Sequence, residues 1–197
     1  MENIKVIFID IDNTLLDFDE YVKETMKNGF KHFSLKEYQP YMYDIFTQEN
    51  NKLWLQIEKG EITFQELEKI RWNNIFKALD ISFDGLLFEK YFRSSLYNSA
   101  ILIDNAVEIL AYLSKKYILC VASNGPYNQQ IHRLEIAHIK QYFSYYFISE
   151  KIGYSKPNKE FFKAAFKELN QKINVLPNEC LIIGDSLTSD IKGGHEY

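Results

Sequence analysis

Residues 6–19 read VIFIDIDNTLLDFD, and this stretch decides the fold of the chain. Val6 to Ile9 form an apolar run without polar alternation, which is typical of a strand buried on both faces of a parallel sheet. Two carboxylates, Asp10 and Asp12, follow one residue apart where the strand ends. Ligands of open α/β sheets collect at the carboxyl ends of the strands. The stretch therefore predicts a parallel sheet with an acidic site at the end of its first strand.

The closeness of these two carboxylates indicates a catalytic site. Like charges that share one crevice repel each other, and either a bound cation or a raised pKa on one acid relieves the repulsion. A purely structural alternative is a strand followed by an ordinary turn, with Asp12 or Asn13 capping the next segment. On these residues alone both interpretations stand.

The composition is that of an ordinary globular protein. The 197 residues include 23 basic and 27 acidic side chains, a formal net charge of −4, and 46% of them are hydrophobic. This balance gives no electrostatic footprint for a nucleic acid polymer or an anionic membrane surface. No apolar run reaches membrane-spanning length, and the first residues do not resemble a secretion signal. Because Cys120 and Cys180 lie in apolar strand-like runs, we expect reduced thiols in the core of a cytoplasmic protein.

The spacing of apolar residues divides the chain into a helical block and an alternating α/β part. Between Glu20 and about Tyr97 they recur at helical spacing, which predicts four helices with breaks near Gly60 and at residues 80–85. After Ile101, strands alternate with helices, which predicts right-handed crossovers and a Rossmann-like parallel sheet. The expected strands cover residues 117–123, 145–150 and 180–185, and the expected helices cover residues 105–115, 126–135 and 158–169.

The segment SNGP, residues 123–126, follows the second expected strand and suits an anion. Ser123 offers a hydroxyl, and Gly125 permits close approach of the backbone. Pro126 fits the first position of a helix, whose free main-chain amides attract negative charge. An ordinary serine or asparagine cap on a helix is the structural alternative.

Two further segments carry charged residues at the ends of expected strands. Lys156 precedes Pro157, and the extended conformation before proline would place the lysine at the mouth of the next helix. Asp185 ends the last expected strand, and Asp190 follows five residues later. A solvated lysine and a helix cap are the structural alternatives for Lys156 and Asp190.

In this order and spacing the four segments resemble the motifs of the haloacid dehalogenase-like (HAD) superfamily, specifically those of its phosphohydrolases. The matching residues are Asp10, Asp12 and Thr14 in the first motif, Ser123 in the second, Lys156 in the third, and Asp185 with Asp190 in the fourth. The resemblance covers nearly the whole chain. It implies a Rossmann-like core of residues 1–16 and 102–197, with a helical cap of the family's first type inserted as residues 17–101.

The resemblance also implies an aspartyl-phosphate mechanism. Asp10 is expected to attack phosphorus as the nucleophile, which divides the displacement into two easier steps. Asp12 is expected to act as general acid/base, first protonating the leaving oxygen and then activating water. Lys156 would neutralise charge and hold phosphoryl oxygens together with Ser123 and the Asn124 amide.

The expected cofactor is Mg²⁺, because carboxylate and carbonyl oxygens favour a hard cation. Its ligands would be Asp10, Asp185 and the main-chain oxygen of Asp12, which leaves the Asp12 side chain for proton transfer. Thr14 and Asp190 are expected to support these groups from a second layer, with Asp190 orienting Lys156.

The substrate is expected to be a small phosphorylated metabolite. The segments TLLDFD, SNGPYNQQIHRLE, FISEKIGYSKPNKEFF and GDSLTSDIKGG resemble the family's pyrimidine 5′-nucleotidase branch, which implies a nucleoside monophosphate. A sugar phosphate or phosphoglycolate remains an alternative, because the cap selects the leaving group. Asp12 argues against a dehalogenase, which typically lacks an acid at that position. A receiver domain of a signalling system also has a phosphorylatable aspartate, a serine or threonine and a lysine, but the cap insertion and the order of the DxD motif argue against it.

One departure from the family pattern concerns the end of the chain. Members usually continue beyond the IKGG segment into a further strand and helix, whereas this sequence stops at Tyr197. We therefore expect the final edge strand to be missing and the strand before Asp185 to have an unpaired edge. A truncated, inactive phosphate-binding remnant is the non-enzymatic alternative.

Overall fold

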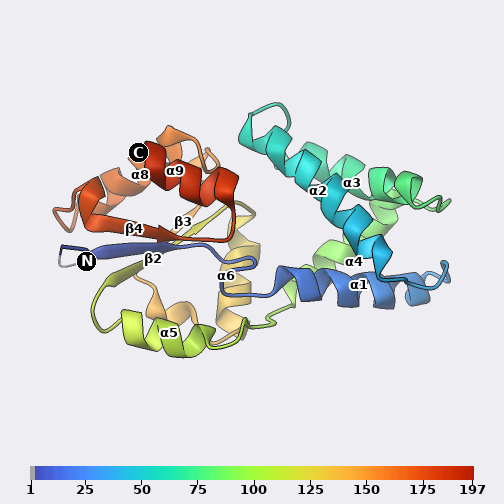
Figure 1. Cartoon of the computed structure of the whole chain (residues 1–197), viewed down its shortest axis with the longest axis horizontal. Helices are drawn as coiled ribbons and strands as arrows, with labels where there is room; N and C mark the ends of the chain where they lie inside the picture. Colours follow the sequence, from blue (N-terminus) through green and yellow to red (C-terminus); the bar gives the residue numbers. More distant parts are fainter. Residues whose placement is uncertain (1–2) are drawn as a thin grey trace. The chain divides into compact units, whose positions relative to one another are not determined.

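The computed structural model describes residues 3–197, and the chain forms two compact units. One unit combines the residues up to Phe18 with Ala100–Tyr197, and the other is Asp19–Ser99. Figure 1 shows that the first unit contains a sheet with helices around it and that the second is built of helices. No helix in the described part of the chain is both long and apolar enough to span a bilayer.

The first unit is built on a four-stranded parallel sheet in the order β3-β2-β1-β4 (Figure 1). Its strands are β1 (Val6–Ile9), β2 (Ile118–Ser123), β3 (Tyr145–Ile148) and β4 (Cys180–Ile183). The chain proceeds from β1 outward through β2 to β3 and then returns to the opposite side of β1. This reversal places a topological switch point at the carboxyl end of β1. The predicted Rossmann-like parallel sheet is confirmed.

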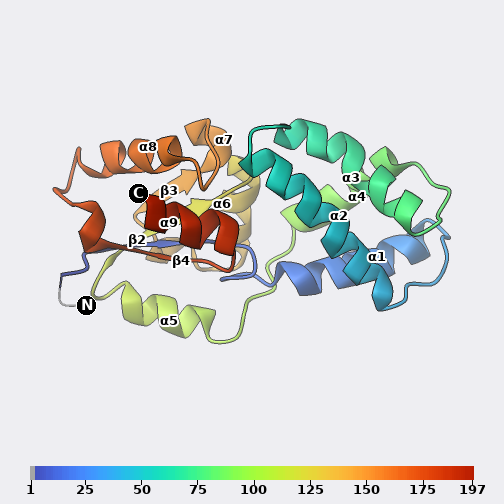
Figure 2. The same cartoon turned by 45° about the horizontal axis from the view of Figure 1, so that its top comes forward.

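Helices cover both faces of this sheet, as expected for strands without polar alternation (Figure 2). Alternate side chains of β1 point to opposite faces. Ile7 and Ile9 lie in one buried cluster with residues of α5 (Ala106–Leu113) and α6 (Tyr127–Ile136). Val6 and Phe8 lie in a second cluster with residues of α8 (Lys159–Leu169). The remaining elements are a 3₁₀ turn at Lys140–Tyr142, α7 (Ser149–Ile152), a 3₁₀ turn at Pro177–Glu179, a π-type turn at Leu187–Ile191 and α9 (Lys192–Glu196).

The third strand is shorter than predicted, because α7 takes up its last two residues. The side chains of these residues contact the start of α6 instead of continuing the sheet. Ser149 Oγ accepts a hydrogen bond from Gly125 N at 2.9 Å, and Glu150 Oε2 accepts one from Tyr127 N at 2.7 Å. The side chains that follow β3 therefore satisfy main-chain donors at the beginning of the neighbouring helix.

Strand β4 forms an edge of the sheet. It pairs with β1, and within residues 3–197 no strand lies on its other side. Leu181 of β4 is exposed and Cys180 is only half-buried, so the expectation of a core position holds for Cys120 and not for Cys180. Both thiols are free.

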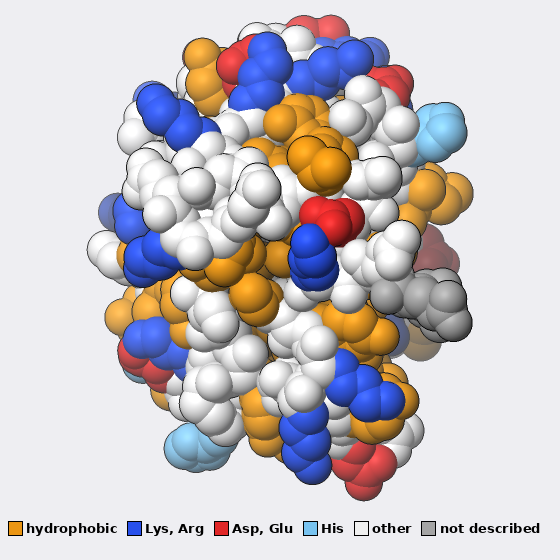
Figure 3. Space-filling model, turned by 90° about the vertical axis from the view of Figure 1, so that its left-hand side faces the viewer, with side chains coloured by type: hydrophobic (Ala, Val, Ile, Leu, Met, Phe, Trp, Pro, Cys, Tyr) orange, Lys and Arg blue, Asp and Glu red, His pale blue; other side chains and the backbone are white. Residues whose placement is uncertain are grey.

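Charged side chains are mixed on the face drawn in Figure 3, which shows the left-hand side of Figure 1. Basic, acidic and apolar side chains alternate there rather than forming one continuous basic surface. Lys5 and Glu179 form an ion pair of 2.6 Å.

The chain passes between the two units twice, and the two connecting segments are hydrogen-bonded to each other within the first unit. Leu16 and Leu102 form an antiparallel bridge, Asp17 N donates to Ile101 O at 2.8 Å, and Ile103 N donates to Leu15 O at 3.0 Å. The segments that leave and re-enter the sheet unit therefore run side by side.

The second unit contains four helices, as the apolar spacing predicts. They are α1 (Phe18–His32), α2 (Tyr41–Glu58), α3 (Phe64–Ala78) and α4 (Gly85–Tyr97). Thr63 and Glu66 form a capping box at the start of α3, and Asp84 accepts hydrogen bonds from the first main-chain amides of α4. Trp72 is fully buried among Phe46, Phe76, Phe88 and Phe92, so these aromatics are packing residues.

A buried ion pair joins α3 to α4 inside this unit. Arg71 donates to Glu89 through Nη2 at 2.5 Å and through Nε at 3.1 Å, and its Nη1 donates to Asn50 Oδ1 at 3.2 Å. The guanidinium also lies 4.7 Å from the centre of the Phe92 ring. All three polar residues are buried, so the loss of one partner would leave a desolvated charge.

We expect Glu89→Ala to lower the free energy of unfolding by about 3 kcal/mol, because it leaves the buried Arg71 unpaired. Glu68→Ala is the matched control, since Glu68 pairs with Arg93 between the same two helices at a more exposed place. The control should cost less than about 1 kcal/mol. Urea unfolding followed by circular dichroism measures both, and equal losses would contradict the argument.

Candidate active site

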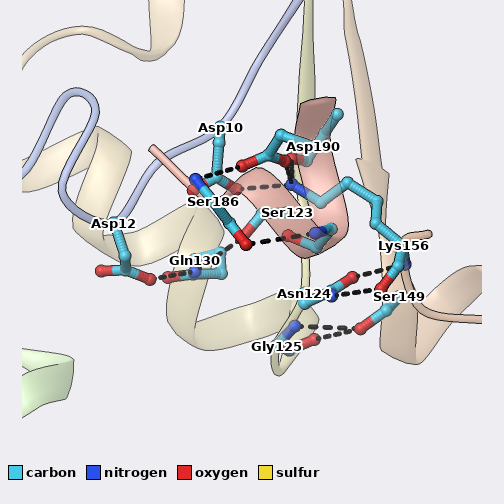
Figure 4. Close-up of polar contacts among 12 residues, drawn as sticks. Asp10, Asp12, Ser123, Asn124, Gly125, Gln130, Ser149, Lys156, Ser186 and Asp190 are labelled. Atoms are coloured by element: carbon cyan, nitrogen blue, oxygen red, sulfur yellow. Dashed lines mark hydrogen bonds and ion pairs between the residues drawn. The ribbon is translucent and has the colours of Figure 1, made fainter. Parts of the chain in front are cut away.

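The switch point of the sheet brings together Asp10, Ser123, Lys156 and Asp190 of the predicted motifs (Figure 4). Asp10 follows β1, Ser123 ends β2, and Asp185 lies just beyond β4. Asp10 N donates to Ile183 O at 2.9 Å, which keeps the ends of β1 and β4 together. Lys156 reaches this crevice from the loop before α8.

The Lys156 ammonium is the buried centre of the site, with only 1% of the residue exposed. It donates to Asp10 Oδ1 at 2.8 Å, to Asp190 Oδ1 at 2.5 Å and to the main-chain oxygen of Ala122. An ammonium group has three hydrogens, and these three acceptors can use all of them. The lysine thus connects the ends of β1 and β2 with the turn after β4.

Asn124 holds the main chain of Lys156. Asn124 Nδ2 donates to Lys156 O at 2.9 Å, and Lys156 N donates to Asn124 Oδ1 at 2.8 Å. Lys156 is joined to Pro157 by a cis peptide bond. Because the side chain of Asn124 is engaged in this way, the phosphate-binding role predicted for this residue is left to its main-chain N–H.

Asp190 contacts Lys156 from the π-type turn after β4 and is completely buried. Its second oxygen accepts from Ser186 N at 3.2 Å. Its carboxylate also lies against Gly184, where a Cβ would come within 2.2 Å of Asp190 Oδ2. Glycine at 184 is therefore required for Asp190 to reach the lysine.

Burial and neighbouring charges alter the titration of this cluster. Desolvation, reinforced by the charge of Asp190, raises the pKa of Asp10 to about 7 although Lys156 opposes the shift. Desolvation and the charge of Asp190 also raise the pKa of Asp185 to about 6. For Lys156, burial opposes the charged form, but the charges of Asp10 and Asp190 outweigh it and raise the pKa.

The donor set fits a hard divalent cation. Asp10, Asp185 and Asp190 each offer a carboxylate oxygen, and these oxygens lie within 4.8 Å of one another. Both oxygens of Asp190 already accept hydrogen bonds, so Asp10 and Asp185 are the better side-chain ligands. The Asp12 carboxylate is not in this group, which is compatible with the prediction that only its main-chain oxygen binds metal. Thr14 Oγ1 is buried and has no hydrogen-bond partner among residues 3–197.

Asp12 has partners that the sequence analysis missed. Arg133 Nη1 donates to Asp12 Oδ1 at 2.6 Å, and Gln130 Nε2 donates to Asp12 Oδ2 at 2.9 Å and to Ser123 Oγ at 2.9 Å. Both partners are buried and lie on α6. A signal existed in the sequence, because a glutamine and an arginine three residues apart on a helix share one face. The chemical roles assigned to the site residues stay predictions.

Comparison with known proteins identifies the family. The family model for the haloacid dehalogenase-like hydrolases matches residues 4–196. The chain belongs to this family. The HAD-like chain also matches the protein YfnB of Bacillus subtilis (strain 168), named as a HAD-hydrolase, with 32% identity over 98% of this chain and 81% of the relative. A crystal structure of YfnB bound to magnesium superimposes with a TM-score of 0.90 at 30% identity, covering 98% of this chain and 85% of that one.

Two further relatives have a named activity. The pyrimidine 5′-nucleotidase PynA of Streptococcus pneumoniae is 31% identical over 97% of this chain and 79% of its own length. The glyceraldehyde 3-phosphate phosphatase of Pyrococcus furiosus is 26% identical over 98% of this chain and 77% of its own length. The predicted family is confirmed, and a nucleotidase and a phosphatase among the relatives agree with the predicted class of phosphatase.

We expect Asp10→Asn to stabilise the metal-free protein at pH 8 by on the order of 2 kcal/mol. The folded chain keeps the Asp10 proton up to about pH 7, whereas the unfolded chain loses it near the ordinary value of 3.8. The folded state binds more protons between these values, so the contribution of Asp10 to stability falls as pH rises. The difference between variant and wild type should therefore shrink from pH 8 toward pH 4.

Thermal unfolding in EDTA over this pH range measures the effect. Asp190→Asn is the contrasting variant and should lower stability, because its amide would turn a second donor toward Lys156 or Ser186 N. An Asp10→Asn protein less stable than wild type at pH 8 would contradict the expectation.

Proposed function

We propose that this HAD-like hydrolase is a Mg²⁺-dependent phosphomonoesterase whose substrates are nucleoside 5′-monophosphates, with a preference for pyrimidines. The observation that carries the catalytic part is the contact of 2.8 Å between the buried Lys156 ammonium and Asp10 Oδ1 at the switch point of the sheet. A fixed cation beside a carboxylate lets that carboxylate approach a phosphoryl group of the same charge.

In the first step Asp10 attacks phosphorus through a carboxylate oxygen. A bond forms between Asp10 and phosphorus, and the bond from phosphorus to the ester oxygen breaks. The carboxyl group of Asp12 gives its proton to the leaving oxygen, so the leaving group departs as a neutral alcohol. Ser123 Oγ and the main-chain N–H of Asn124 hold the phosphoryl oxygens during this transfer. Lys156, whose hydrogens are directed to Asp10, Asp190 and the Ala122 oxygen, offsets negative charge beside the nucleophile.

In the second step water hydrolyses the aspartyl-phosphate. The Asp12 carboxylate takes a proton from the water molecule while the water oxygen attacks phosphorus. The bond between Asp10 and phosphorus breaks, inorganic phosphate leaves, and Asp10 and Asp12 return to their starting states. The sum of both steps is hydrolysis of one phosphate monoester by one water molecule.

Mg²⁺ would be held by the side chains of Asp10 and Asp185 and the main-chain oxygen of Asp12. When bound, it would neutralise part of the negative charge of the acid cluster and of the phosphoryl group. The oxygen donors on Asp10 and Asp185 and the magnesium in the YfnB crystal structure support this assignment.

The substrate assignment is supported by PynA, which is named as a pyrimidine 5′-nucleotidase and matches 97% of this chain. The second candidate substrate is a phosphorylated sugar, which the similarity to the Pyrococcus phosphatase favours. The core residues act on the phosphoryl group in either case, so the two candidates differ only in the leaving group.

We expect the purified 197-residue chain with Mg²⁺ to release phosphate from UMP, dUMP and dTMP with kcat/KM at least about tenfold above that for AMP. Asp10→Asn should lower kcat/KM by a factor of about 1,000 or more, because it removes the nucleophile. The assay panel includes glyceraldehyde 3-phosphate and phosphoglycolate, and phosphate release is measured for each substrate.

Turnover of only the sugar phosphate or phosphoglycolate would keep the mechanism and overturn the nucleotidase assignment. Unchanged turnover by Asp10→Asn would overturn the mechanism. Absence of any turnover by a folded chain whose melting temperature rises with Mg²⁺ and phosphate would favour an inactive phosphate-binding protein.

A further inference from the structure

The Asp12 carboxylate is held by two buried side chains of α6. Arg133 Nη1 donates to one of its oxygens at 2.6 Å, and Gln130 Nε2 donates to the other at 2.9 Å. Arg133 and Gln130 are each 1% exposed, whereas 30% of the Asp12 side chain is exposed. A carboxylate in a loop would otherwise sample several rotamers, so these contacts select one orientation.

Gln130 also links Asp12 to the phosphate-binding serine (Figure 4). Its Nε2 donates to Ser123 Oγ at 2.9 Å in addition to Asp12, and its Oε1 accepts from Arg133 Nη1 at 2.9 Å. The Arg133 contact fixes which end of the amide points to Asp12. Because Ser123 Oγ accepts this hydrogen bond, its own hydrogen stays available for another acceptor, as a phosphate-binding hydroxyl requires.

Stability alone explains this arrangement poorly. Burying a guanidinium costs several kcal/mol, and a buried ion pair is often no more stable than apolar residues of the same volume. Helix α6 already contributes Leu134 to the apolar core beneath the sheet, so a further apolar residue could fill the Arg133 position. The buried charge lies beside the one acid that the proposed mechanism uses for proton transfer.

We propose that Arg133 and Gln130 are positioning residues that hold Asp12 in register with Ser123 for proton transfer. The proposal rests on the proposed phosphatase function. When Asp12 has given its proton to the leaving oxygen, the N–H groups of both residues stabilise the resulting carboxylate in place. The same carboxylate then faces the water that attacks phosphorus. A displacement of about 1 Å at such a group can cost about 100-fold in rate, so loss of Arg133 or Gln130 should have a measurable effect.

The test is a double-mutant cycle between Arg133→Met and Asp12→Asn. Arg133→Met keeps most of the side-chain volume, and it should lower kcat for UMP by about 10- to 100-fold with KM changed less than about threefold. In the Asp12→Asn background the same change should lower kcat by less than about twofold, because Arg133 then has no acid to position. With 4-nitrophenyl phosphate the leaving group needs no protonation, so release of 4-nitrophenolate in the first turnover reports the first step in the Asp12→Asn variant, although its second step still lacks the base.

Three further measurements separate positioning from structural damage. Arg133→Lys should recover part of the lost kcat, since an ammonium can still donate to Asp12 although not in the same fork geometry. Glu135→Gln is the control on the same helix, because Glu135 pairs with Lys140 at the surface, and it should behave as wild type. The loss of kcat/KM caused by Arg133→Met, which reports the first step, should be larger for UMP than for 4-nitrophenyl phosphate, whereas damage to the site would lower both equally.

Gln130→Met provides a second route if Arg133→Met does not fold, as judged by circular dichroism and thermal unfolding. It should lower kcat and also raise KM, because it disconnects Ser123 as well as Asp12. The inference would be overturned if Arg133→Met had equal effects in both backgrounds. An unchanged kcat in either Arg133→Met or Gln130→Met would overturn it as well. In each of these cases turnover by the wild type would still support the proposed function. Absence of wild-type turnover on every phosphate monoester would overturn both.

Discussion

The site depends on one buried ammonium group that has three acceptors. Lys156 bridges Asp10 after β1, the Ala122 carbonyl in β2 and Asp190 in the turn after β4. These segments are far apart in the sequence, and the ammonium draws their oxygens to one point that apolar packing alone does not specify. The surrounding contacts support this group: Asn124 fixes the lysine main chain, and Gly184 leaves space for Asp190.

The acid cluster lowers the stability of the folded chain and favours the proposed reaction. Three carboxylates meet here, of which Asp10 and Asp190 are buried and Asp185 is exposed. A single lysine does not offset the cost of burying the first two, as the raised pKa of Asp10 indicates. Natural sites commonly give up stability in this way, because a charge that is already desolvated reacts without further reorganisation of solvent. A divalent cation at Asp10 and Asp185 would remove much of that cost, and its binding would then be coupled to folding.

Local patterns predicted most of the architecture and the motif residues. The apolar runs that end in Asp10, Ser123 and Asp185 marked three strand ends, and helical spacing gave four helices between Glu20 and Tyr97. The spacing of Gln130 and Arg133 could have indicated that they share a helix face, but not that this face contacts Asp12, because Gln130 is 118 residues away from it in the sequence. For the same reason the helix after β3 was misread as strand: its polar residues cap α6, a contact that exists only in the folded unit.

The paired crossings at Leu16–Leu102 and Asp17–Ile101 have an evolutionary consequence. The helical unit begins and ends where these two segments are paired, and it has its own aromatic core and buried Arg71–Glu89 pair. Such a unit can be lengthened, shortened or replaced without a shift in the register of the parallel strands, because chain ends that lie together tolerate insertion. The paired crossings would therefore let the helical unit vary in sequence and length while the sheet unit and the acid cluster at its switch point stay as they are.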